Sequence, residues 1–379
     1  MPVRNFAEQE LDLVKEVLQS GQLSALGGPV TPRFEAEFAA AMGAKHGVAM
    51  NSAMSVLHAS VITAGAGAGS EVICDSIFIF GALAALYNNA VPVFVDVNPV
   101  THNMDPDKIE AAVTERTKAI IVTHAWGLPA EMDRIMEVAN RHGLIVIEDC
   151  AHAILASYQG RKTGTWGHIG SFSFQASKQM STGDGGMAVT DDDELARQLD
   201  LHAGAPTFLS VAYGLHFNYR MTELTAAVGL AQLAKLPQQI AGLQAAAKWF
   251  DQAVEGCPWL VLQRGPEGAV HTYHFWVATF RGEEYGIRKE DFLRVLGETK
   301  CGASVGYTNM PAYRHPVIAD RLAHAFHCPA YKGQVEYPDG LCPVAEDLVP
   351  RTVLVYTYAP EDSLKATAEA LRKTVEILS

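Results

Sequence analysis

One lysine in this sequence stands in a context that is unusual for a surface lysine. Lys178 follows Ser173 by five residues and lies between two β-type runs, 172–174 and 187–190. The turn before the second run, 183–186, reads Gly-Asp-Gly-Gly, and its glycines allow two backbone segments to approach closely. A lysine amine held between buried strands can act as a nucleophile and form a Schiff base with a carbonyl group.

A pair of carboxylates follows another buried run. The apolar residues 144–147 are followed directly by Glu148 and Asp149. Open α/β sheets bind ligands beyond the carboxyl ends of their strands, and an acid there can pair with a protonated pyridine nitrogen. Taken singly, Lys178 reads as a solvated lysine and Asp149 as a helix cap. Together they are the minimum equipment for pyridoxal 5′-phosphate (PLP) chemistry.

Strands and helices that could position these groups alternate along the first part of the chain. The short strands are β-branched and lack polar alternation, which indicates a mostly parallel sheet covered by helices on both faces. The expected strands are 46–50, 71–74, 92–97, 118–124 and 144–149. The expected helices are 6–20, 34–42, 54–63, 81–87, 106–114 and 131–142.

A second, smaller unit is expected toward the carboxyl terminus. The pattern is helical from residue 221 to about residue 254, and glycines and prolines punctuate 256–268. The elements expected after this stretch are a strand at 274–280 and helices at 289–297, 317–326 and 363–378. We therefore expect an α/β fold with a large PLP-binding domain at 1–245 and a small α+β domain at 246–379.

Composition narrows the classes of partner. Lys and Arg total 29 against 42 for Asp and Glu, so the formal net charge is −13, which argues against a nucleic-acid-binding surface. The six cysteines form no Cys-x-x-Cys pair and show no zinc-ligand spacing. No apolar stretch approaches the length of a membrane span, and no signal peptide is apparent. We expect a cytoplasmic protein with reduced thiols, no metal site and no membrane contact.

The same motifs resemble the DegT/StrS-type sugar aminotransferase family of fold-type-I PLP enzymes. The matching segments occur in collinear order, and residues beyond about 241 match more loosely. These segments are 27–55, 91–106, 124–139, 147–153, 170–186 and 217–233. The resemblance implies a large domain with a seven-stranded type of sheet between helices, and PLP or its amine form as cofactor.

Three catalytic roles follow from the resemblance. Lys178 would hold PLP as a Schiff base and then move a proton between carbon atoms of the substrate and cofactor. Asp149 would keep the pyridine nitrogen protonated. His152 occupies the position where the family carries Gln or His near the 3′-oxygen or the ring face of the cofactor; a structural histidine is the alternative.

The resemblance also assigns phosphate ligands. The family binds the phosphate at a small-residue turn that opens a helix, and this chain has Asn-Ser-Ala-Met-Ser at 51–55. Backbone N–H groups of Ala53 and Met54 can serve there, but the usual threonine hydroxyl is absent, so Ser55 or Ser52 would replace it. Ser173 matches a family phosphate ligand more closely.

Asn218 resembles the family residue that reaches the phosphate of the neighbouring subunit. If so, two chains of a homodimer share each active site. The alternative is that Asn218 or Thr222 caps the helix that follows.

Aromatic and substrate-facing residues are assigned more loosely. Phe78 is the expected stacking residue on the pyridine ring, with Phe80 close behind, although both could be core residues. The segment 305–316 takes the place of the family's substrate loop. The expected substrate residues are His124, Tyr307, Tyr313 and His315, with Trp126 as a further pocket residue.

The expected activity is amino transfer. Glutamate or glutamine would donate nitrogen to PLP, and the keto group of a sugar, nucleotide-linked or free, or of a cyclitol would accept it, in amino-sugar or natural-product biosynthesis. Two alternatives remain. A sugar dehydratase on this scaffold would replace Lys178 with histidine, and a non-catalytic regulator would bind PLP or a sugar without turnover.

Overall fold

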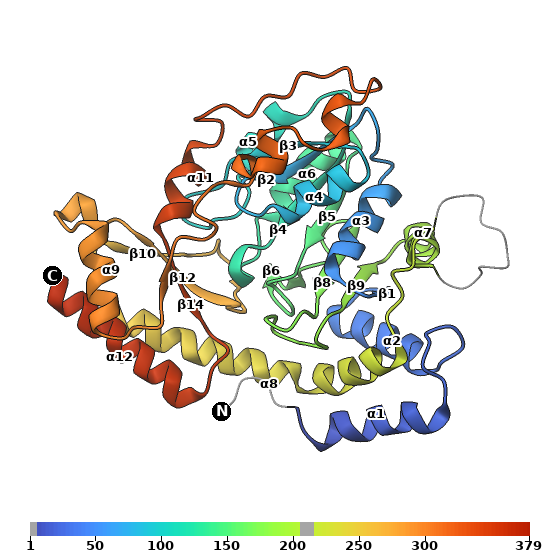
Figure 1. Cartoon of the computed structure of the whole chain (residues 1–379), viewed down its shortest axis with the longest axis horizontal. Helices are drawn as coiled ribbons and strands as arrows, with labels where there is room; N and C mark the ends of the chain where they lie inside the picture. Colours follow the sequence, from blue (N-terminus) through green and yellow to red (C-terminus); the bar gives the residue numbers. More distant parts are fainter. Residues whose placement is uncertain (1–5, 205–215) are drawn as a thin grey trace.

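A central sheet of seven strands forms the larger part of the molecule (Figure 1). The computed structural model describes residues 6–204 and 216–379. The strand order is β1-β9-β8-β5-β4-β2-β3, and only β9 runs antiparallel to its neighbours. The strands are β1 (His46–Met50), β2 (Glu71–Asp75), β3 (Val91–Val95), β4 (Thr117–Thr123), β5 (Ile145–Asp149), β8 (Ile169–Ser173) and β9 (Gly186–Thr190).

Helices cover both faces of this sheet, as the unalternating strands predict. Ile73 of β2 packs with residues of α5 and α6, whereas its neighbours Val72 and Cys74 pack with residues of α4. Every residue of β2, β8 and β9 is buried. The covering helices are α2 (Val30–Met42), α3 (Ala53–Thr63), α4 (Phe80–Tyr87), α5 (Pro106–Ala112), α6 (Met132–His142) and α7 (Asp193–Ala203).

A long helix, α8 (Glu223–Ala253), connects the large sheet to a smaller antiparallel one. In Figure 1, α8 runs beneath both units, with α1 (Glu8–Ser20) below it. The smaller sheet has the order β10-β12-β14-β13. Its strands are β10 (Leu260–Leu262), β12 (Phe275–Phe280), β13 (Ser304–Val305) and β14 (Thr352–Tyr356), and the helices of the smaller unit include α9 (Lys289–Glu298) and α12 (Glu361–Leu378). The domain boundary expected at residue 245 falls inside α8 and stays a prediction.

One expected helix in the smaller unit is wrong. Instead of a single helix at 317–326, the chain forms α10 (Pro316–Ala319) and a short 3-10 turn, η4 (His324–His327). Between them Arg321 takes φ 52°, a left-handed conformation that an α-helix does not accommodate. The adjoining Tyr313 and Ile318 pack into the core of the large sheet beside Leu57. This segment therefore returns from the small sheet to the large unit.

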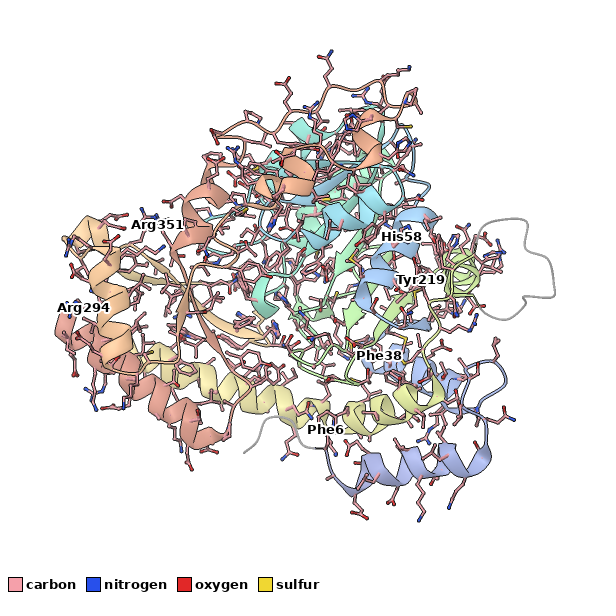
Figure 2. All side chains as sticks on the ribbon, viewed as in Figure 1. Phe6, Phe38, His58, Tyr219, Arg294 and Arg351 are labelled. Atoms are coloured by element: carbon pink, nitrogen blue, oxygen red, sulfur yellow. The ribbon has the colours of Figure 1, made fainter. Side chains whose placement is uncertain are left out.

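Side chains fill the space between α8 and the large sheet (Figure 2). Phe38 of α2 lies there, 5.1 Å from the ring of Phe172 and 5.2 Å from that of Phe174. Since Phe172 and Phe174 point to this side of β8, Ser173 between them faces the other side.

None of the described helices combines the length and apolar composition required to span a membrane.

Candidate active site

Lys178 lies in the loop between β8 and β9. The loop is closed by a backbone bridge between Gln175 and Gly183, and the N–H of Lys178 donates to the carbonyl of Gln175 (2.8 Å). Burial lowers the pKa of the Lys178 amine to about 8, while the negative charge of Asp149 acts in the opposite direction. A larger fraction of this amine is neutral near pH 7 than of an ordinary lysine.

Asp149 ends β5 and is only 3% exposed. Its Oδ1 accepts a hydrogen bond from the backbone N–H of Ala151 (3.0 Å). Burial raises the pKa of this carboxyl above its ordinary value, against the opposing effects of the Ala151 N–H and the Lys178 charge. A cationic partner beside Asp149 would restore the ionised form, and a protonated pyridine nitrogen is such a partner.

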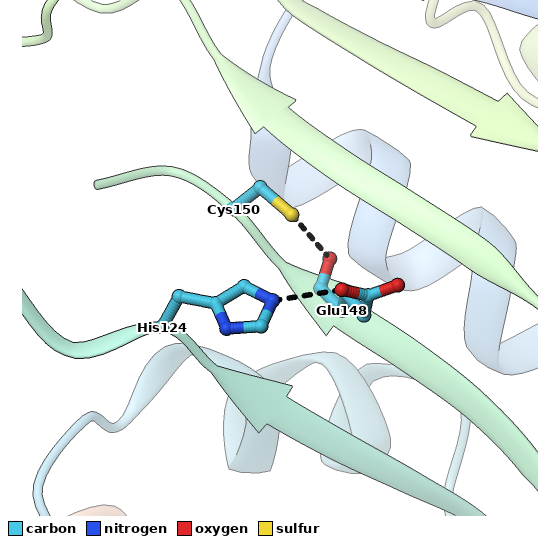
Figure 3. Close-up of side chains that lie close together, drawn as sticks. All are labelled: His124, Glu148 and Cys150. Carbon is cyan, nitrogen blue, oxygen red and sulfur yellow. Dashed lines mark hydrogen bonds and ion pairs between the residues drawn. The ribbon is translucent and has the colours of Figure 1, made fainter. Parts of the chain in front are cut away.

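The adjacent carboxylate, Glu148, is committed to the backbone on the other side of the strand. Its Oε2 accepts from the N–H of Gly164 (2.8 Å) and its Oε1 from the N–H of Gly167 (2.6 Å). Its Oε2 also accepts from Nε2 of His124 at 2.8 Å (Figure 3). The structure therefore makes Glu148 a structural residue.

His124 corrects one of the sequence-based expectations. It is fully buried, and its Nδ1 accepts a hydrogen bond from the N–H of Ala130 (3.1 Å). Nε2 must then carry the proton that is donated to Glu148. Both ring nitrogens are occupied, so His124 fixes the β4–β5 framework and does not line the substrate pocket.

His124, Glu148 and Cys150 have ligand atoms within 4.8 Å of one another, but their chemistry does not suit a metal (Figure 3). The Nε2 of His124 is protonated, and both oxygens of Glu148 already accept hydrogen bonds. Burial and the two adjacent carboxylates raise the pKa of the Cys150 thiol well above its ordinary value. Its S–H points to the carbonyl of Glu148 (3.7 Å), which indicates packing.

The turn at 51–55 forms the amino terminus of α3. The hydroxyl of Ser52 accepts from the N–H of Ser55 (3.1 Å), and the Ser55 hydroxyl donates to Oδ1 of Asn51 (2.6 Å). These bonds occupy both hydroxyls locally, whereas Ala53 and Met54 open the helix, where N–H groups have no partner within it. The backbone amides therefore suit an anion better than the serine hydroxyls.

Gly186 lets this turn lie directly against β9. A Cβ at Gly186 would sit 2.5 Å from the carbonyl carbon of Ser52 and 2.6 Å from the nitrogen of Ala53. The Gly-Asp-Gly-Gly motif thus brings the strand beside the helix terminus. Ser173, 5% exposed on β8, belongs to the strand that pairs with β9.

An aromatic group lines the site beside His152. The ring of Phe78 meets that of His152 edge-on at 5.4 Å and that of Trp126 at 5.0 Å. Tyr307 contacts the rings of Phe78 (5.5 Å) and Trp126 (4.7 Å). Burial, with the charges of Asp75 and Asp149, raises the pKa of Tyr307 to about 12. Phe78 and Tyr307 therefore belong to one aromatic group with Trp126 and His152, and their roles toward cofactor and substrate stay predictions. Phe80 is 47% exposed on the surface.

Two other expected substrate residues differ in placement. Tyr313 is fully buried, with its ring 5.6 Å from Phe94 and its hydroxyl donating to Oε1 of Glu346 (2.5 Å). The expectation that Tyr313 contacts substrate is therefore wrong, because its single polar atom is engaged within the core. His315 is half-buried, and its Nε2 has no partner among the described residues; its role stays a prediction.

Asp75, not singled out from the sequence, holds the loop that carries Phe78. Its Oδ1 accepts from the N–H groups of Ile77 (3.0 Å) and Phe78 (2.8 Å), and its Oδ2 accepts from the Thr123 hydroxyl (2.6 Å). Burial raises the pKa of Asp75 to about 6. A carboxylate that ends a buried strand, the same signal that identified Asp149, could have identified this residue.

Asn218 keeps its side chain exposed in the single chain. Its backbone carbonyl accepts from Nδ2 of Asn51 (3.4 Å), and the next carbonyl, of Tyr219, accepts from the N–H of Asn51 (2.7 Å). The cap of α8 is Thr222, whose hydroxyl accepts from the N–H of Thr225 (3.2 Å). Asn218 is therefore not the helix cap, and its amide is available to another molecule.

Comparisons with known proteins identify relatives over most of the chain. The model of the DegT/DnrJ/EryC1/StrS aminotransferase family matches residues 4–362. The spore coat polysaccharide biosynthesis protein SpsC of Bacillus subtilis is 34% identical, with 98% of this chain and 95% of that protein aligned. GDP-perosamine synthase of Caulobacter vibrioides is 37% identical over 83% of this chain and 84% of its own.

The fold is also found among solved structures. An aminotransferase from Psychrobacter cryohalolentis superposes with a TM-score of 0.88, covering 100% of this chain and 99% of its own at 29% identity. The expected α/β fold is confirmed.

Proposed function

The chain belongs to the DegT/DnrJ/EryC1/StrS aminotransferase family, and on this premise we propose that it uses PLP to aminate a sugar or cyclitol ketone. The proposal is supported chiefly by the pair Lys178, half-buried in the β8–β9 loop, and Asp149, buried at the end of β5, whose charges influence each other. Glutamate or glutamine is the proposed nitrogen donor.

The residues of the site fit PLP. Lys178 supplies the amine that would hold the aldehyde, and Asp149 the carboxylate for the pyridine nitrogen. The N–H groups of Ala53 and Met54 at the start of α3, with the hydroxyl of Ser173, suit the phosphate. When bound, PLP would supply an electron sink that stabilises negative charge at the α-carbon of the amino donor.

Lys178 carries the proton transfer in this proposal. Its amine would accept the proton from the α-carbon of the amino donor and, as the conjugate acid, would be the group that gives the proton back. A pKa of about 8 suits both steps, because the amine exists in both protonation states near neutral pH. Asp149 would pair, in its ionised form, with the cationic ring nitrogen of the cofactor. The rings of Phe78, Trp126 and Tyr307 form the apolar part of this region.

The acceptor class is supported by the relatives. One is a GDP-perosamine synthase, and another is a spore coat polysaccharide biosynthesis protein. Within this chain, Tyr307 and His315 are the proposed substrate-facing residues. The presence of Lys178 disfavours a dehydratase, and the pairing of Lys178 with Asp149 disfavours a binding protein without turnover.

One experiment tests the cofactor and the reaction together. The purified protein is loaded with PLP, reduced with borohydride and digested, and the pyridoxyl group should be found on Lys178. Adding glutamate or glutamine before reduction should remove the label, because the cofactor then leaves the lysine as its amine form. A label on another lysine would contradict the assignment, and a label that both amino donors leave in place would contradict the proposed donor class.

A further inference from the structure

A short segment before β12, residues 272–274, joins the smaller unit to the active site. The N–H of Thr272 donates to the carbonyl of Gly127 (3.0 Å), and the N–H of His274 donates to the carbonyl of Trp126 (2.8 Å). The buried amide of Gln179, the residue after Lys178, donates to the carbonyl (3.0 Å) and hydroxyl (2.9 Å) of Thr272. The segment is thus bonded both to the turn after β4 and to the lysine loop.

The close approach of these parts depends on Gly127. Its φ is 106°, and a Cβ there would lie 2.9 Å from the carbonyl oxygen of His152 and 2.9 Å from the nitrogen of His274. The turn after β4, the His152 loop and segment 272–274 therefore converge at one point. Substitution at Gly127 would separate them.

His274 contacts His152 directly through its ring. The two imidazoles stack with centroids 4.3 Å apart and planes at 25°, and His274 is 2% exposed. Trp126 also lies nearly parallel to His152, at 5.9 Å and 19°.

The Nδ1 of His152 is buried and has no hydrogen-bond partner among the described residues. The orientation of a functional imidazole is ordinarily set by the hydrogen bond that its second nitrogen makes. In place of a hydrogen bond at Nδ1, His152 has stacking contacts with the rings of His274 and Trp126. Burial, with the charges of Lys178 and His274, lowers the pKa of His152 well below its ordinary value, so the ring is neutral.

We propose that His274 is a positioning residue that holds the His152 imidazole in place for the cofactor by ring stacking. This inference rests on the proposed function, because it assumes that His152 contacts PLP. A residue of the smaller unit, His274, would then determine the orientation of His152, which belongs to the large unit.

The test compares variants of His274 with a matched control. His274→Ala removes the stacked ring, and His274→Phe keeps a ring of similar area. The control is His271→Ala, which removes a second imidazole from the stretch that leads into β12. The ring of His271 stacks on Tyr273, with centroids 3.8 Å apart. The readouts are the dissociation constant of PLP and the absorption spectrum of the bound cofactor, with the melting temperature measured in parallel.

We expect His274→Ala to weaken PLP binding about threefold to tenfold, the range of a lost aromatic contact, and to change the cofactor spectrum. His274→Phe should stay within about twofold of the unmodified protein. His271→Ala should lower the melting temperature without altering the spectrum. If His274→Ala does not fold, His274→Leu, which fills the volume without a ring, takes its place.

A double-mutant cycle shows whether His274 acts through His152. In a His152→Ala background, His274→Ala should cause no further loss of PLP affinity. Equal losses with and without His152, equal losses in His274→Phe and His274→Ala, or no loss at all would each overturn the proposal. Failure of the unmodified protein to bind PLP at Lys178 would instead contradict the proposed function, which separates the two outcomes.

Discussion

Glu148 and Asp149 are neighbours in β5, yet their carboxylates serve opposite sides of the strand. Glu148 accepts two backbone N–H groups and the imidazole of His124, whereas Asp149 accepts the N–H of Ala151 and lies within the electrostatic reach of Lys178. Successive side chains of a strand point to opposite sides, so Glu148 stabilises the fold on one side while Asp149 faces the candidate active site on the other.

Glu148→Gln should lower stability while leaving PLP binding intact. The neutral amide cannot accept from Gly164, Gly167 and His124 together, so a buried donor loses its partner. We expect a loss of about 1.5–3 kcal/mol in the free energy of unfolding, measured by denaturant titration. The control Glu37→Gln alters only an exposed pair with Arg33 and should change stability by less than about 0.5 kcal/mol. Equal effects of the two variants would contradict the framework role.

Asp149→Asn should impair the reaction while the fold persists, the reverse of the result expected for Glu148→Gln. The fold should persist, because the side chain keeps its shape, but the ring nitrogen loses its anionic partner and PLP becomes a weaker electron sink. We expect the half-reaction with glutamate to slow by orders of magnitude, measured by single-turnover absorbance with PLP bound. A near-normal rate would remove Asp149 from the proposed mechanism.

The residues proposed for cofactor binding are identified from signals that are local in the sequence. Lys178 is marked by the Gly-Asp-Gly-Gly turn, and Asp149 by its position at the end of an apolar run. The apolar neighbours of Ser173, Phe172 and Phe174, determine its direction through the alternation of β8. Each of these inferences needs only a few adjacent residues and the geometry of a parallel sheet.

The incorrect or missed expectations concern residues whose placement depends on tertiary contacts. His124 follows a strand end just as Asp149 does, but its two nitrogens are taken by Ala130 and Glu148, which no local pattern reveals. Tyr313 is in a segment that packs into the large unit rather than at the site. His274 reaches the site from the smaller unit, more than ninety residues after Lys178 in the sequence, and a single sequence does not indicate that approach.

The lowered pKa of Lys178 predicts how PLP capture depends on pH. Only the neutral amine attacks the aldehyde, so the rate of PLP binding to the cofactor-free protein should rise with pH and level off above about 8. The charge of Asp149 raises this pKa, so Asp149→Asn should move the midpoint to lower pH. Stopped-flow absorbance between pH 6 and 10 is a suitable measurement. A rate still rising at pH 10 would indicate an ordinary lysine.

Asn218→Ala should weaken PLP binding if two chains share each site. The amide is exposed in the single chain, and the turn at Ala53 and Met54 offers backbone donors without the family's threonine hydroxyl. A net charge of −13 provides no general attraction for a phosphate, so each local donor matters. One lost hydrogen bond to a charged group costs about 1.5–3 kcal/mol, or more than tenfold in the dissociation constant, measured by absorbance titration.

Mixing the two variant chains distinguishes a shared site from a local one, at a PLP concentration too low to load the Asn218→Ala protein. If Asn218 serves the neighbouring chain, a hybrid of Lys178→Ala and Asn218→Ala chains has one site with both lesions and one with neither, so activity should return after subunit exchange. If Asn218 serves its own chain, each hybrid site keeps one lesion and no activity returns. Thr222→Ala is the matched control: it removes the actual cap of α8, costs about 1 kcal/mol of stability, and should leave PLP affinity unchanged.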